Sequence, residues 1–146
     1  MNRYTLLCVL LMIAFGSSAR AQETIGFVKA VSEEAMVIDA GKYVLARVGT
    51  PVKQGSVLKT GPRGSMGVTF KDNTVMSFGP DTELTVDEFL YAPTKGELEF
   101  SASISRGTLQ IVSGVIARLK PGSAFLKTPA GTIGMRDAHF LVKIDQ

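Results

Sequence analysis

The side chains best suited to chemistry gather in one stretch of the chain, at Arg136, Asp137 and His139. His139 is the only histidine, and a strand would place Asp137, two residues earlier, on the same face. A carboxylate that orients a histidine can make it a general base, provided that a nucleophile lies within reach. No nucleophile with the spacing of a catalytic set accompanies this pair, so a polar pair at a strand edge is the simpler interpretation. We therefore expect a protein that is not an enzyme.

Arg136 is the polar residue with the clearest binding chemistry. It follows Gly134 and Met135, and a guanidinium can hold a carboxylate or a phosphate through two parallel hydrogen bonds. The alternative is a structural hydrogen bond to a nearby carbonyl or acid, which is a common use of arginine. We take Arg136, Asp137 and His139 as the candidate binding residues.

Carboxylates offer weaker candidates for acid–base work. Asp87 and Glu88 are adjacent, so a regular strand would place them on opposite faces. Glu97 and Glu99 would share a face, but their strict alternation with apolar residues explains them as the solvated side of a strand.

The composition predicts no metal site, no cofactor and no nucleic-acid partner. One histidine, and a single cysteine (Cys8) that lies in a segment we expect to be removed, leave only carboxylates as metal ligands. The formal net charge of +3 falls to +1 without Arg3 and Arg20. Such a chain has no strong positive field to attract phosphate backbones.

The sequence predicts that the elements that position the candidate residues are strands. Apolar and polar residues alternate over much of residues 22–146, which is the period of half-buried strands. The clearest runs cover residues 65–70, 97–104, 115–120 and 140–145; weaker runs cover residues 25–31, 36–40, 43–48, 57–60, 74–78, 84–91, 109–112 and 124–128. Turn residues interrupt them about every ten residues, among them Asp72-Asn73, Arg106-Gly107 and Pro121-Gly122. We predict one all-β domain of many short strands, either a twisted two-layer sandwich or a short distorted β-solenoid.

Two further groups of side chains could form surfaces if their strands were neighbours. Aromatic residues could stack on a sugar, although core packing is their default, and basic residues could form a patch, although a scattered wet face is the simpler interpretation. The aromatic group is Phe27, Tyr43, Phe89 and Tyr91, and the basic group is Arg118, Lys120, Lys127 and Lys143.

Several short blocks, in order along the chain, resemble the motifs of one family, the FecR domain. Gly55-Ser56-Val57-Leu58-Lys59-Thr60 is similar to the end of its "G-x-x-V-x-x-G-D-x-I-x-T" stretch. The best match, residues 127–136, resembles the closing "T-P-x-A-T-I-G-x-R-G-T-x-F", with Asp137 and Ala138 in place of the glycine and threonine after the arginine. The residues that carry this closing motif are Thr128, Pro129, Gly131, Ile133, Gly134 and Phe140.

The resemblance implies a compact, twisted all-β domain of the periplasm that senses or binds a partner. The FecR domain is the sensing domain of iron-dicitrate-type transmembrane regulators and also occurs in standalone exported proteins. We therefore expect a sensing or interaction domain that docks an envelope protein or a cell-envelope polymer, with a role in cell-surface signalling left open. The alternative is a periplasmic module that binds a glycan or a small ligand.

Residues 1–21 are typical of a secretory signal peptide. Arg3 is followed by a dozen mostly apolar residues, and Ala19 and Ala21 form the small-residue pattern of a cleavage site. The apolar run is shorter than the roughly 20 residues of a membrane-spanning helix. We expect cleavage before Gln22, a single FecR-like domain over residues 22–146 without a membrane span, and a periplasmic or secreted location.

Overall fold

The structure, a computed structural model, describes residues 22–136 and 139–145, and it is built almost entirely of β-strands. The expected signal peptide and Asp137 lie outside the described residues. The strands are β1 (Thr24–Ser32), β2 (Ala35–Asp39), β3 (Lys42–Leu45), β4 (Pro51–Lys53), β5 (Val57–Thr60), β6 (Ser65–Phe70), β7 (Val75–Phe78), β8 (Glu83–Ala92), β9 (Glu97–Val112), β10 (Ala124–Thr128), β11 (Gly131–Gly134) and β12 (His139–Ile144). The short helices are η1 (Pro93–Lys95), α1 (Val115–Leu119) and η2 (Pro121–Ser123).

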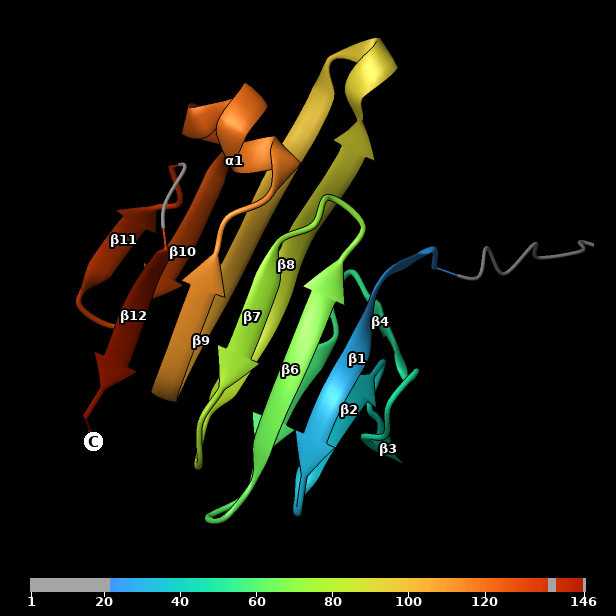
Figure 1. The fold of residues 1–146 in the computed structure, drawn as a ribbon, viewed down its shortest axis with the longest axis vertical. Coiled ribbons are helices and arrows are strands. Elements are labelled where there is room, and N and C mark those ends of the chain that lie inside the picture. The colour runs from blue at the N-terminus through green and yellow to red at the C-terminus, as the bar shows by residue number, and fades with distance from the viewer. Residues whose placement is uncertain (1–21, 137–138, 146) are drawn as a thin grey trace, which may run out of the picture.

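The strands form one continuous hydrogen-bonded sheet that folds over into two layers. One layer has the order β4-β1-β6-β7-β9-β12, and the other has the order β3-β2-β5-β8-β9-β10-β11. Figure 1 shows β1, β6 and β7 in front of β2 and β8. The all-β prediction is confirmed. Among the described residues the β10–β9 pairing is the one parallel ladder, which differs from the parallel stacking of a regular β-solenoid and favours the sandwich alternative.

The long strand β9 belongs to both layers because it bends at Gly107. Up to Arg106 it pairs with β8 and β10, and from Gly107 onward it pairs with β7 and β12. Gly107 has φ +99°, a conformation that a residue with a Cβ rarely adopts. The prediction of two separate strands with a turn at Arg106-Gly107 is therefore wrong: the glycine bends the chain, but the strand runs through it.

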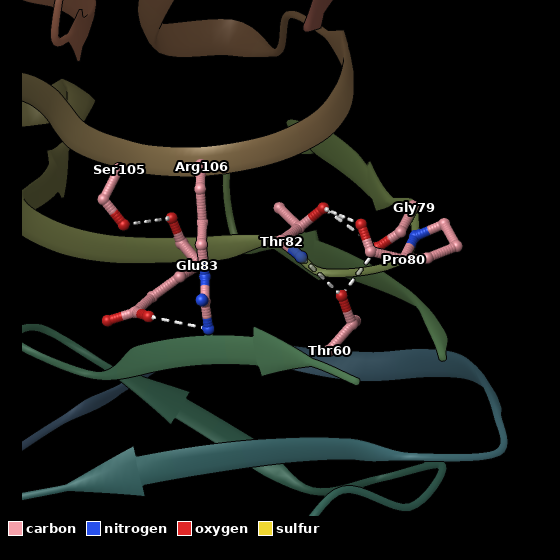
Figure 2. Close-up of polar contacts among 7 residues, drawn as sticks. All are labelled: Thr60, Gly79, Pro80, Thr82, Glu83, Ser105 and Arg106. Atoms are coloured by element: carbon pink, nitrogen blue, oxygen red, sulfur yellow. Dashed lines mark hydrogen bonds and ion pairs between the residues drawn. The ribbon is translucent and has the colours of Figure 1, made fainter. Parts of the chain in front are cut away.

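A cluster of polar side chains holds this bend (Figure 2). The buried Thr82 hydroxyl accepts the Thr108 backbone N–H at 3.0 Å, and it lies 2.9 Å from the Gly79 carbonyl, to which it can donate. The Thr60 hydroxyl also donates to the Gly79 carbonyl, at 2.6 Å, and accepts the Thr82 N–H at 3.0 Å. Beside them, Arg106 and Glu83 form a salt bridge of 3.4 Å. The threonine hydroxyls thus form hydrogen bonds with backbone groups that have no strand partner where the chain changes layer.

The two layers enclose an apolar core centred on three aromatic rings. Phe70 of β6 packs against Phe89 of β8 and Phe100 of β9, with ring centroids 5.8 Å and 5.0 Å away, and Phe89 and Phe100 meet edge to face at 5.3 Å. Phe89 is therefore a core residue and does not join Phe27 and Tyr43 on a sugar-stacking surface.

The segment 115–120 is a correction to the sequence prediction, which assigned a strand there. Val115–Leu119 forms the one-turn helix α1, with Ile116 and Ala117 buried. Its first backbone N–H groups are satisfied by Asp72, whose carbonyl accepts from Val115 at 2.8 Å and whose carboxylate accepts from Ile116 at 3.3 Å. A buried residue 44 positions earlier thus makes a helical turn favourable where local alternation indicated a strand.

Candidate functional site

The closing-motif residues build a β-hairpin at one end of a layer. β10 lies parallel to β9, and β11 pairs with β10 from Phe125–Gly134 to Thr128–Gly131. The Thr128 hydroxyl accepts the Ala130 N–H at 3.2 Å and donates to the Gly131 carbonyl at 2.8 Å, while Pro129 restricts φ within the turn. Thr128, Pro129 and Gly131 are therefore turn-forming residues. The strand β11 itself was missed, because its four residues have no apolar alternation.

A groove opens where this hairpin meets the η2 turn. It has a volume of about 390 Å³ and is lined by Pro121, Gly122, Ala124, Phe125, Thr132, Gly134 and Arg136. These residues come from η2, β10, β11 and the segment after β11. The chain brings them together because the hairpin returns β11 alongside β10, next to the turn from which β10 starts.

The backbone around Arg136 is fixed while its side chain remains exposed. The Met135 side chain is buried and its N–H donates to the Ala124 carbonyl at 2.9 Å. The Ser113 hydroxyl donates to the Arg136 carbonyl at 3.0 Å. Within residues 22–136 and 139–145, no ion pair to the Arg136 guanidinium is observed. The backbone of Arg136 is thus held beside the groove, and the hydrogen-bonding capacity of its exposed guanidinium can serve a ligand.

Two glycines keep the groove open. A Cβ added at Gly122 or at Gly134 would meet no atom within 4 Å, and neither residue has a positive φ. Their backbone lies bare at the groove, so a ligand can approach it closely.

Two of the basic residues for which a patch was the alternative interpretation, Lys120 and Lys127, lie beside the groove. The Lys127 ammonium lies 5.7 Å from the centroid of the Phe125 ring, and the exposed Lys120 directly precedes Pro121. Lys143, by contrast, is on β12 in the other layer. Lys120 and Lys127 therefore add positive charge near Arg136, while Lys143 is not part of that group.

His139 does not share the groove with Arg136. It is the first residue of β12, opposite Val112 of β9, in the other layer. Its Nε2 accepts a hydrogen bond from the Gln110 side-chain amide, which is not a nucleophile. Asp137 lies outside the described residues, so the Asp137–His139 pairing stays a prediction. The described contacts of His139 are those of an exposed strand residue.

The two remaining motif residues, Phe140 and Ile133, differ in their packing. Phe140 of β12 is half-buried and packs against the core. Ile133 of β11 lies opposite the buried Leu126 and is 36% exposed. Because β11 pairs only with β10 among the described strands, one side of Ile133 remains open to a further strand.

Carboxylates gather on the outer face of β8 and β9, which the sequence analysis did not foresee. The register of these strands shifts between Val86 and Glu88, and Asp87 accepts a hydrogen bond from Ser103 across the strands. This bulge places Asp87 and Glu88 on the same face, so the expectation of opposite faces was wrong. A hydrogen bond with Glu99 and the negative charge of Glu99 raise the pKa of Glu88, while Lys127 lowers it.

Metal binding finds no support in the described residues. No group of three or more histidine, cysteine, aspartate or glutamate side chains there is arranged to hold a metal ion. The same part of the chain holds no helix whose length and hydropathy would let it span a bilayer.

Comparison with known proteins matches this chain to one family model. The model, described as FecR protein, covers residues 56–146, more than half of the chain. The matched segment includes the β10–β11 hairpin and every residue that lines the groove. No curated protein and no solved structure matches the chain.

Proposed function

The chain belongs to the FecR family, a family of sensing and regulatory domains, and from this premise we propose that it docks a protein of the cell envelope. The groove around Arg136 is the proposed docking site. One observation carries the proposal: an exposed arginine, fixed through the backbone on both sides, stands in a groove within the family-matched segment.

The proposal includes export of the domain. The pattern of residues 1–21 supports a cleaved signal peptide, and FecR domains typically work in the periplasm. The mature domain, residues 22–146, would then meet its partner in the periplasm or outside the cell.

Binding is favoured over catalysis by what surrounds each polar group. His139 contacts an amide, and the exposed Arg136 has no described acid–base partner. A groove with an exposed arginine on a fixed backbone, an aromatic wall and bare backbone provides what recognition needs. Arg136 is the proposed ligand contact, whereas Asp137 and His139 are proposed only to border the partner.

A small-ligand or glycan module is the second candidate. Its support is the groove volume of about 390 Å³, which lies in the range of small-molecule sites, and the half-buried Phe125 ring in its wall. A small anionic ligand would use Arg136 in the same way.

Site-specific photocross-linking in living cells tests the docking site. A photoreactive phenylalanine analogue at Thr132, which lines the groove, is expected to capture one dominant envelope protein. The same analogue at Ser77, exposed on β7 in the other layer, is the matched control. Arg136→Ala should reduce capture from Thr132 without changing the folding of the domain, because its side chain is exposed.

Equal capture from both positions, or none from Thr132, would contradict the proposal. In the second case, a rise in melting temperature with cell-wall fragments or glycans would support the ligand-binding module, since a ligand that binds only the native state stabilises it.

A further inference from the structure

The strand β11 is an open edge beside the groove. It pairs with β10 and, among the described residues, with no other strand, and all four of its residues are exposed. An unpaired strand edge presents backbone N–H and C=O groups on which a further strand can form. We propose that the partner docks as an extended peptide segment that adds to β11 and places a carboxylate on Arg136; this inference rests on the proposed docking function.

Side-chain alternation along β11 sets the pattern of the incoming segment. Thr132 and Gly134 lie opposite Lys127 and Phe125, on the groove side, whereas Ile133 lies opposite the buried Leu126. An added strand would therefore place one side chain against Ile133, which is 36% exposed, and the next over Gly134. Because a Cβ at Gly134 would meet nothing within 4 Å, the groove has room for an apolar side chain beside Phe125.

The charges around the groove require the segment to be acidic at the Arg136 end. Arg136, Lys120 and Lys127 stand at or beside the groove, and no described carboxylate lines it. The acidic groups on this face lie on β8 and β9: Glu88 of β8, whose pKa Lys127 lowers, is two strands away from β10. A carboxylate is thus attracted to the Arg136 end of the groove and repelled at β8.

A peptide fits this site better than a polysaccharide. The open edge offers a row of backbone hydrogen-bonding groups at the spacing of another strand, which only a polypeptide backbone matches in register. The guanidinium then adds a two-pronged contact with a carboxylate from an aspartate, a glutamate or the C-terminus of the segment.

Synthetic peptides can test this inference directly. The probes are octapeptides that alternate threonine with valine, isoleucine, leucine or phenylalanine. The first set contains one aspartate and has an amidated C-terminus. The second set has asparagine in place of the aspartate and a free C-terminal carboxylate. The third set has the asparagine and an amidated C-terminus, so it carries no carboxylate. NMR titration of the mature domain, residues 22–146, is expected to shift the backbone amides of β11 and Arg136 with one or both acidic sets. The neutral set should bind at least about tenfold more weakly.

Two variants locate the contact. Arg136→Ala should weaken binding of the acidic peptides at least about tenfold and leave the neutral set unchanged, because a charge-assisted contact is lost. Gly134→Val fills the groove without strain, since its φ is not positive and the space is open, so it should weaken all peptides. Arg63→Ala, which removes an exposed arginine from the turn between β5 and β6, is the control and should change nothing.

The outcomes separate this inference from the proposed function. If no acidic peptide binds, or if binding ignores Arg136→Ala and Gly134→Val, the strand-addition inference is overturned. Photocross-linking from Thr132 that still captures one envelope protein would then leave the docking function standing. Aspartate-dependent and terminus-dependent binding both support the inference and identify the source of the carboxylate.

Discussion

Gly107 and Thr82 are in such close contact that a side chain on the glycine would overlap the threonine. A Cβ built on Gly107 falls against the Cα and the side chain of Thr82, and Gly107 has φ +99°. The Thr82 hydroxyl in turn accepts the N–H of Thr108, the residue after the glycine. This pair lets β9 pass from one layer to the other.

Gly107→Ala is expected to destabilise the domain by about 2–5 kcal/mol, because unfavourable φ and overlap with Thr82 add together. Urea denaturation of the purified domain measures this loss. Gly55→Ala separates the two causes, since Gly55 has φ +86° but open space around it. An equal loss of stability in both variants would show that the overlap with Thr82 is unimportant.

Thr82→Val should cost about 1–3 kcal/mol, because the nearly isosteric valine leaves the partly buried Thr108 N–H without its acceptor. Thr82→Ser keeps the hydroxyl and should retain most of the stability. Thermal unfolding of the two variants gives the comparison, and a valine variant as stable as the serine variant would contradict the role of the hydroxyl.

Asp72→Ala should release the α1 turn. The fully buried Asp72 carboxylate accepts from the Thr74 N–H, the Thr74 hydroxyl and the Ile116 N–H, so its removal leaves buried donors unpaired, at a cost of about 2–4 kcal/mol. Hydrogen exchange should show faster exchange at Val115 and Ile116 than at β6 and β7. Asn73→Gly changes the exposed neighbour as a control for the turn, because glycine tolerates the φ of +68° at this position. Unchanged protection of Ile116 in Asp72→Ala would rule out this anchoring.

The Glu88–Glu99 pair predicts a pH dependence. Because a hydrogen bond with Glu99 and its charge raise the pKa of Glu88 above 4.5, the folded state binds this proton more tightly than the unfolded state. Stability from this group is therefore present at low pH and is lost as pH rises from about 4.5 through the raised folded-state value. Glu88→Gln should remove that loss.

Denaturation midpoints measured from acidic to neutral pH, at low and high salt, test the pair. The wild type should lose stability relative to Glu88→Gln as pH rises, and salt should reduce the difference because the site is exposed. Glu97→Gln removes the same charge from the neighbouring strand β9 and serves as the control. A pH profile identical in wild type and Glu88→Gln would show that Glu99 does not perturb Glu88 in solution.

Local patterns in the sequence are enough to predict the strand content of this domain. The alternating segments at residues 57–60, 65–70 and 124–128 have the same bounds as the strands β5, β6 and β10. A strand with one buried face needs apolar residues at every second position, whichever strand it pairs with. The alternation can therefore be recognised from neighbouring residues alone. The ordered FecR-like blocks likewise indicated the family to which the chain belongs.

Contacts between residues far apart in the sequence decided the remainder. The helical turn α1 depends on Asp72, the bulge that turns Asp87 outward depends on the register with β9, and the continuous bend of β9 depends on Thr82. The groove exists only because the hairpin returns β11 beside β10, next to the turn that carries Pro121. The sequence by itself therefore determined the all-β class and the position of Arg136 in a closing motif, and only the tertiary structure placed that arginine in a groove beside an open strand edge.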